Sequence, residues 1–260
     1  MFGLCVWLST AVLAQTPAGI SAAQARHSGS QYLSPQLLAL QNDPARNPLS
    51  LFLERGQSLW SAQCSACHGD IASLTSSAAV FPRLGQGGLG LVNLEDQIAI
   101  CQKRGATHDA LGQSKASAVQ EEDIVAISAV LHQTAKGQII RTEAPQAQAD
   151  KAQWQLHLDQ GQKLYTSRMG RMNLACMHCH DQKVGAQMRA DTISQGHPTG
   201  FPIYRMSWQT AGTVDRRLRA CYSGVQAPVP TTGSIELRQL ELYLKVRANG
   251  MALDGPSIRR

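Results

Sequence analysis

The chain has 260 residues, a length that fits two domains of about 100 residues each after a leader segment. Its formal net charge of +6 favours anionic partners or substrates. Aromatic residues make up 5% of the chain and do not alternate with basic clusters, so nucleic acid is excluded as an expected partner.

The N-terminus is typical of an export signal. Residues 2–13 form an apolar run that is too short to span a bilayer, and cleavage is expected after Ala14 or Ala25. The basic residues that usually precede such a run are missing. No later segment is long and apolar enough to cross a membrane, so we expect residues 1–25 to be a signal peptide and the rest of the chain to lack a membrane anchor.

The sequence holds two Cys-x-x-Cys-His motifs, and the first directly follows a helix predicted over residues 50–63. Their residues are Cys64, Cys67 and His68 in the first motif and Cys176, Cys179 and His180 in the second. The spacing is the c-type haem attachment pattern, in which two cysteines bind the porphyrin through thioethers and the histidine binds the iron. The sequence therefore predicts two covalently bound haem c groups. Because haem is attached to such proteins outside the cytoplasm, we expect a periplasmic protein.

Other uses of paired cysteines fit less well. Zinc ribbons place their pairs about 15–20 residues apart, whereas Cys67 and Cys176 lie in different halves of the chain. A thioredoxin-like redox site needs a βαβ context, which the sequence does not indicate. Plain disulfides remain an alternative.

Helix caps are predicted at equivalent places in the two halves. Asn93 is expected to cap a helix that leads to Cys101, with two acidic residues in its first turn. Thr213 is expected to cap a helix over residues 214–220, just before Cys221.

The last helix is expected to begin after Ser234, because leucines recur on one face at positions 237, 240 and 244. No segment shows the alternation of a β-strand, so the fold class is predicted as all-α.

The two halves are duplicates of one another. The matched landmarks are Leu53–Trp60 with Leu158–Tyr165, Phe81-Pro82 with Phe201-Pro202, Cys101 with Cys221, and Gly137 with Gly250. A long period with matched landmarks indicates tandem copies of one fold. We predict two tandem class I cytochrome c domains, at 26–140 and 154–260, joined by a linker at 141–153.

The second axial ligand of each iron is predicted by the same duplication. Residues 26–150 contain no methionine, which leaves His108, His132 and Cys101 as candidates in the first half. Among these only Cys101 has an equivalent in the second half, Cys221. The simplest interpretation is His/Cys ligation of both irons, which should lower their potentials.

Two alternatives to this ligation stay open. Cys101 and Cys221 could be buried free cysteines, which are common in protein cores. At the second iron, Met206 or Met251 could replace Cys221.

The surroundings of the two helix cysteines differ in charge. Arg217 lies four residues before Cys221 and therefore on the same helix face, while the first half has the neutral Gln97 at that position. Arg216 and Arg219 lie further round the helix. Since arginine can hold an oxyanion through two parallel hydrogen bonds, the second haem is predicted to be an anion-handling catalytic centre. The first haem is predicted to be an electron relay or a structural relic.

The residues at this centre are similar to a known family. The segments 201–208 and 216–225 resemble SoxA, the catalytic subunit of the SoxAX cytochrome of bacterial sulfur oxidation. The resemblance implies that His68 and Cys101 are axial ligands of the first iron, and that His180 and Cys221 are axial ligands of the second. It also implies that Cys221 is a cysteine persulfide at the active site.

The resemblance further implies an activity and partners. Arg217 would contact thiosulfate, and the enzyme would be an L-cysteine S-thiosulfotransferase that conjugates thiosulfate oxidatively to a cysteine of the carrier protein SoxYZ. Electrons would leave through haem c to SoxX, a monohaem cytochrome that forms a heterodimer with the chain. Two alternatives are a dihaem thiosulfate dehydrogenase that forms tetrathionate, and a dihaem cytochrome that only transfers electrons.

Overall fold

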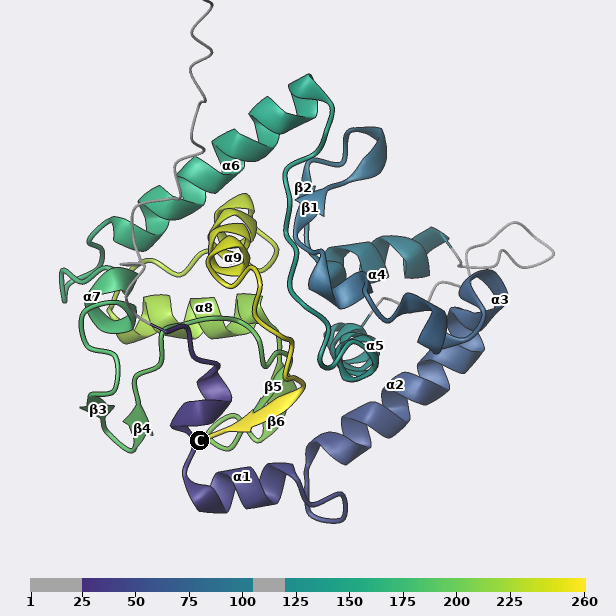
Figure 1. Ribbon diagram of the computed structural model, residues 1–260, viewed down its shortest axis with the longest axis horizontal. Helices are drawn as coiled ribbons and strands as arrows, with labels where there is room; N and C mark the ends of the chain where they lie inside the picture. The colour runs from purple at the N-terminus through teal and green to yellow at the C-terminus, as the bar shows by residue number, and fades with distance from the viewer. Residues whose placement is uncertain (1–24, 105–119) are drawn as a thin grey trace, which may run out of the picture.

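The computed structural model describes residues 25–104 and 120–260 (Figure 1). The cleavage position Ala14 and the candidate ligand His108 lie outside these residues. The helices are α1 (Pro35–Gln41), α2 (Leu49–Gln63), α3 (Ser65–His68), α4 (Leu94–Arg104), α5 (Glu121–Thr134), α6 (Gln148–Thr166), α7 (Cys176–His180), α8 (Val214–Gly224) and α9 (Ile235–Arg247). Short 3-10 helices are η1 (Gly29–Tyr32), η2 (Ile71–Leu74), η3 (Ser77–Ala79) and η4 (Gln86–Gly88).

The strands are short and make three small sheets. They are β1 (Arg83–Leu84), β2 (Leu91–Val92), β3 (Gln187–Met188), β4 (Asp191–Thr192), β5 (Ile203–Arg205), β6 (Thr210–Gly212) and β7 (Ser257–Arg259). The hairpins β1–β2 and β3–β4 are two-stranded, and β5 lies between antiparallel β6 and parallel β7. The sequence did not indicate these strands, because two or three residues are too few to show an alternating pattern.

The predicted helix starts at positions 94, 214 and 235 are confirmed. The Asn93 side chain accepts from the backbone of Asp96 at 2.9 Å, and the Asp96 carboxylate accepts from the backbone of Asn93 at 3.1 Å. Thr213 accepts from the backbone of Arg216 at 3.5 Å. Ser234 precedes α9 as expected, but its hydroxyl makes no capping bond. Helix α8 continues four residues beyond the predicted end, to Gly224.

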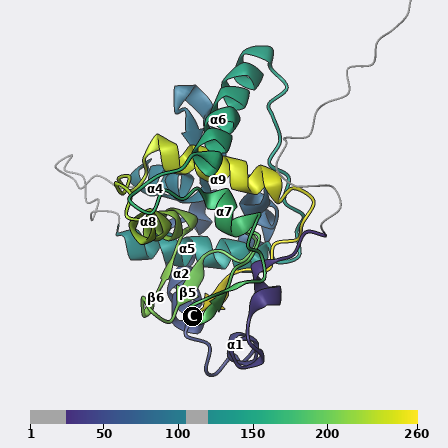
Figure 2. The ribbon, with the colours of Figure 1, turned by 90° about the vertical axis from the view of Figure 1, so that its left-hand side faces the viewer.

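The duplicated halves build two equivalent helix pairs. In Figure 1 α5 and α9 are seen end-on, with α2 and α6 lying across them on the outside, and Figure 2 shows α9 from the side beneath α6. A glycine lies at each crossing: a Cβ on Gly56 would be 2.2 Å from the carbonyl oxygen of Ala126, and a Cβ on Gly161 would be 2.1 Å from that of Gln239. These two glycines occupy equivalent positions in the repeated segments, so both close contacts come from one ancestral packing.

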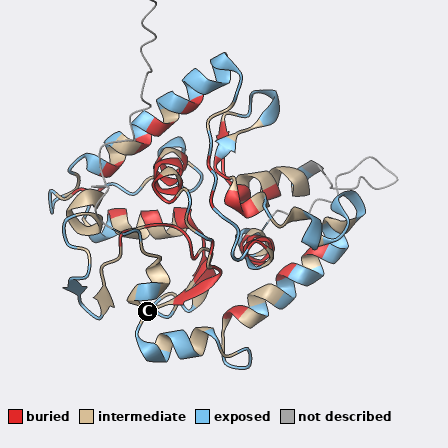
Figure 3. Cartoon of the chain, viewed as in Figure 1, coloured by how far each residue is buried: buried red, intermediate tan, exposed pale blue. Residues whose placement is uncertain are grey.

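Buried residues are concentrated on α5 and α9 (Figure 3). The core around α5 also includes Ala248 and Leu253 from the end of the chain. The segments that follow α5 and α9 run alongside each other, with Ile140 bonded through its backbone to Met251 at 2.9 Å and to Gly250 at 3.0 Å. The two halves therefore share part of their core.

Residues 25–41 contact the second half of the chain. His27 donates its backbone N–H to Gln195 at 2.6 Å, and Ile258 in β7 donates to Gln41 at 3.0 Å. Helix α6 starts at Gln148, within the segment predicted as a linker. The domain limits at 26–140 and 154–260 stay a prediction.

The fold class is confirmed, since helices form the bulk of the structure and the core, and the sheets are small. Within the described ranges, none of the helices combines the length and the apolar character needed to cross a membrane.

Candidate active site

The first Cys-x-x-Cys-His motif lies at the end of α2 and in α3. Cys64 ends α2, and His68 is the last residue of α3. Trp60 in α2 donates its indole N–H to the carbonyl of Gly69 at 3.2 Å, and its ring centre lies 5.9 Å from that of His68. This contact fixes the motif against the helix that precedes it.

The second motif is held more tightly. His180 at the end of α7 lies with its Nδ1 2.7 Å from the carbonyl oxygen of Ser194, which makes Nδ1 the donor and leaves the Nε2 lone pair for a metal. Burial lowers the pKa of His180, and the charge of Arg217 lowers it further, which favours the neutral ring that an iron ligand needs. Gly196, at φ +74, packs on this ring: a Cβ there would lie 3.1 Å from the Cγ of His180.

Each helix cysteine lies near the first cysteine of its own motif. Burial raises the pKa of Cys64, and the charge of Cys101 in α4 raises it further. Burial likewise raises the pKa of Cys176 to about 12, with the charge of Cys221 in α8 as the next cause. The packing agrees: Gln102, next to Cys101, donates to Gln63, next to Cys64, at 2.8 Å, and Cys176 packs against the core that Leu218 and Tyr222 of α8 share.

The donor set fits haem c. The six cysteines of the described residues are free thiols, and His180 already has the second-sphere hydrogen bond that haem-binding histidines need. Among residues 25–104 and 120–260, no group of three or more His, Cys, Asp or Glu could hold a metal ion by itself. A porphyrin supplies four nitrogen donors, so iron in haem needs only two donors from the protein.

The remaining ligand candidates lie in other surroundings. His132 is buried in α5, with its Nδ1 2.9 Å from the carbonyl of Ser128, and it faces a small cavity that Glu95, Glu241 and Lys245 also line. Met251 packs against the core of the first half, and Met206 is exposed.

In the first half, the residue four positions before the helix cysteine contacts its sulfur. Gln97 donates its side-chain amide to the Sγ of Cys101 at 3.3 Å. Arg217 is the equivalent residue for Cys221, which supports the predicted orientation of its guanidinium toward the second sulfur.

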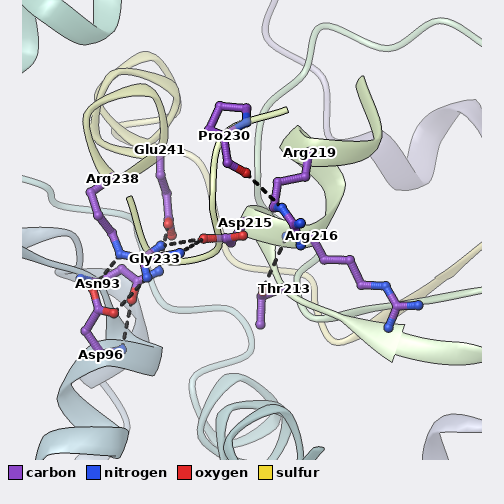
Figure 4. Close-up of polar contacts among 10 residues, drawn as sticks. All are labelled: Asn93, Asp96, Thr213, Asp215, Arg216, Arg219, Pro230, Gly233, Arg238 and Glu241. Carbon is purple, nitrogen blue, oxygen red and sulfur yellow. Dashed lines mark hydrogen bonds and ion pairs between the residues drawn. The ribbon is translucent and has the colours of Figure 1, made fainter. Parts of the chain in front are cut away.

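The other two arginines of α8 have different partners. Arg216 stacks on Trp208, with its guanidinium carbon 4.8 Å from the ring centre. Arg219 donates to the carbonyl of Pro230 at 3.1 Å, and the two side chains point in different directions (Figure 4). Both side chains are thus held by partners other than Cys221.

Two charged residues with structural partners, Arg238 and Arg205, belong to no sequence motif. Arg238 of α9 donates to Asp96 through Nε at 2.5 Å and Nη2 at 2.7 Å, and to Asp215 through Nη1 at 3.0 Å (Figure 4). It therefore joins α4 and α8, the helices that carry the two cysteines. Arg205 in β5 is a further charged residue outside any motif; it donates to Asp191 at 3.1 Å and lies over the Trp208 ring, 5.7 Å from its centre.

The comparisons with known proteins agree with this geometry. The chain matches no protein-family model. It is 29% identical over 226 residues to the L-cysteine S-thiosulfotransferase subunit SoxA of Pseudaminobacter salicylatoxidans, covering 84% of this chain and 75% of the relative. The same subunit of Allochromatium vinosum is 38% identical over 127 residues, 48% of this chain and 44% of the relative.

A solved structure supports the same assignment. The crystal structure of SoxXA from P. pantotrophus matches with a TM-score of 0.77 and 26% identity, covering 90% of this chain and 87% of the matched chain. In sequence and in fold the chain is similar to the SoxA subunits, which confirms the resemblance predicted from the residues around Cys221.

Proposed function

We propose that this protein is an L-cysteine S-thiosulfotransferase, which conjugates thiosulfate oxidatively to the cysteine of a carrier protein. The observation that carries the proposal is the position of Cys221, which lies beside the second Cys-x-x-Cys-His motif with Arg217 on the same helix face. The activity is the one that the matched SoxA subunits are named for.

The reactive sulfur would be a persulfide on Cys221. Its terminal sulfur forms a bond with the sulfane sulfur of thiosulfate, and two electrons are lost. The product on the Cβ of Cys221 is –S–S–S–SO₃⁻, in which the first sulfur is that of the cysteine. The carrier thiolate then attacks the sulfane sulfur, takes the S–SO₃⁻ group and leaves the persulfide on Cys221. Sulfur-to-sulfur transfer proceeds through thiolates, so the attacking and leaving sulfurs must both be deprotonated.

The chain's own residues would bind and orient these groups. Arg217 holds the sulfonate oxygens and compensates the charge of the dianion. His180 is fixed in one tautomer by Ser194 and would bind iron through Nε2. A bound haem would supply the acceptor for the two electrons that are lost when the sulfur–sulfur bond forms.

Several finer parts belong to the same proposal. Each half would hold one covalently attached haem c, with His68 and Cys101 as the axial ligands in the first and His180 and Cys221 in the second. The protein would work in the periplasm, pass electrons to the monohaem cytochrome SoxX and load the carrier SoxYZ. Support comes from the two motifs and from the match to a SoxXA structure.

The test is the substitution Cys221→Ala, with Cys101→Ala as the matched control. In Cys221→Ala we expect thiosulfate conjugation to fall below detection, while mass spectrometry still finds two haems per chain. Cys101→Ala should keep conjugation, because the position equivalent to Arg217 holds the neutral Gln97 in the first half.

Retained turnover in Cys221→Ala would contradict the proposal. Tetrathionate formation by the parent protein without any carrier would favour a thiosulfate dehydrogenase. The mass of the Cys221 peptide tests the persulfide, since one extra sulfur adds about 32 Da.

A further inference from the structure

Asp181, the residue that follows His180, is held by two side chains from other helices. Its Oδ1 accepts from the hydroxyl of Tyr165 in α6 at 2.7 Å and from the Nη2 of Arg247 in α9 at 2.6 Å. Its backbone N–H donates to the carbonyl of Met177 at 3.0 Å and so closes α7. Through Asp181, the end of α7 that carries His180 is therefore fixed to both α6 and α9.

Arg247 is a buried cation next to the second motif. Its side chain is 5% exposed, and that of Asp181 is 18% exposed. The guanidinium carbon lies 4.3 Å from the ring centre of Tyr165 and 5.9 Å from that of Tyr243, so aromatic rings take the place of water beside it. Charges shielded from water act on their neighbours more strongly than surface charges do. The ion pair therefore places two opposite charges beside the residue predicted to bind the second iron.

The first half of the chain makes the equivalent contact without charges. In each half, an aromatic side chain of the first repeated helix bonds to the residue that follows the histidine of the motif. In the second half Tyr165 donates to the carboxylate of Asp181, and in the first half Trp60 donates to the backbone carbonyl of Gly69 at 3.2 Å. The contact that ties a motif to its helix thus does not require a carboxylate.

Arg247 also lacks a charged counterpart. Counted back from the matched Gly137 and Gly250, its position in the first half holds Thr134. Both members of the ion pair therefore replace uncharged residues, and they do so in the half to which the sulfur chemistry is assigned. This difference indicates a role for the charges beyond holding the motif in place.

The charges beside an iron ligand affect the potential of that iron. A negative charge favours ferric over ferrous iron, and a positive charge has the opposite effect. Thiolate ligation already lowers the potential. A lone carboxylate at position 181 would lower it further, whereas Arg247 at 2.6 Å offsets the charge of that carboxylate.

We propose that Arg247 is a positioning residue of the second haem site. It holds the His180 end of α7 through Asp181, and its charge keeps the carboxylate from lowering the potential of the second haem. The proposal rests on the proposed function, since it takes His180 as a ligand of the iron that receives the electrons.

The midpoint potential of the second haem, measured by spectroelectrochemical titration of the holoprotein, tests this role. Asp181→Asn removes the negative charge and should raise the potential, while Arg247→Gln removes the positive charge and should lower it. At the midpoint potential of the parent, the ratio of ferrous to ferric iron should change about tenfold in each variant, in opposite directions. The double variant should stay within about threefold of the parent, because both charges are then absent.

Asp159→Asn and Lys163→Gln are the matched controls. They remove one charge of each sign from exposed positions of α6, where solvent screens the charge, and should change the ratio less than about twofold. The transition that moves in Cys101→Ala belongs to the first haem, and it should keep its potential in the Asp181 and Arg247 variants.

Two results would overturn the proposal. A purely structural role would shift the potential in the same direction in both single variants, or leave it unchanged. If a single variant failed to attach two haems, Arg247→Lys and the double variant would decide, since neither leaves one buried charge unpaired. Both should keep a potential close to that of the parent, and a tenfold change of the ratio in either would contradict the role of Arg247. Loss of conjugation in Cys221→Ala would leave the proposed function standing in each of these cases.

Discussion

At the scale of single residues, the two helix cysteines show how a duplicated site has diverged. Gln97 reaches the sulfur of Cys101 at 3.3 Å, and the equivalent position at the second sulfur holds Arg217. The helical spacing of four residues predicted from the sequence that positions 97 and 217 lie on the same helix face as their cysteines. The pairing of β5 with β7, whose residues lie more than fifty positions later, could not be predicted in the same way.

Because carboxylates are buried between the halves, we predict that the stability of the protein depends on pH. Glu241 accepts a hydrogen bond from Asn93 at 2.9 Å, and burial followed by the charge of Glu95 raises the pKa of Glu241 from 4.5 to about 7. Between these two pH values the folded protein binds a proton more tightly than the unfolded chain does. Its free energy of unfolding therefore falls as the pH rises from 4.5 to 7.

Glu241→Gln should remove the contribution of Glu241 to this change in the free energy of unfolding with pH. The stability of the parent relative to Glu241→Gln, measured by denaturant unfolding, should fall by about 2–3 kcal/mol between pH 4.5 and pH 7. His132 acts in the opposite direction, because burial lowers its pKa to about 3, but it is present in both proteins and cancels in the difference. The same pH dependence in both proteins would contradict this assignment.

At the scale of elements, the close approach of the two crossing helices in each half depends on a glycine. Gly161 in α6 lies against the backbone of α9, and Gly56 in α2 lies in the same way against α5. The repeated Gly-Gln pair was visible in the sequence as a landmark. Its role was not visible, because the close approach involves a backbone oxygen from a distant helix.

Gly161→Ala should destabilise the protein by about 2–4 kcal/mol, since the added Cβ would force the two helices apart. Gly224→Ala is the control: it also lies in a helix, but a Cβ there would meet nothing within 4 Å. This second change should leave the stability unchanged or raise it by up to about 1 kcal/mol. Equal unfolding midpoints in the two variants would show that the helices are less tightly packed at Gly161 than the structure indicates.

The sequence predicted the long elements well and the short ones poorly. Helices α4 and α8 carry capping residues at Asn93 and Thr213 and extend over several turns, so local signals sufficed to place them. Strands β5 and β7 have three residues each and form only because distant segments meet. The contact of residues 25–41 with the second half depends in the same way on partners from the far end of the chain.

At the scale of the whole molecule, the halves are joined through charged and apolar contacts. Arg238 holds Asp96 of the first half and Asp215 of the second, and the core around α5 takes in Ala248 and Leu253. Both cysteine-bearing helices are therefore anchored on α9. The two cysteine sites are thus held on one shared helix, and the residue four positions before the cysteine differs in charge between them, Gln97 in the first half and Arg217 in the second.

The ligand of the second iron is the most direct test of this account. The near-infrared spectrum of the ferric holoprotein distinguishes a thiolate sulfur from a methionine thioether opposite the histidine. We predict no methionine band in the parent, and in Cys221→Ala a change of ligand at one haem while the haem ligated by Cys101 keeps its spectrum. A methionine band in the parent that persists unchanged in Cys221→Ala would contradict the account.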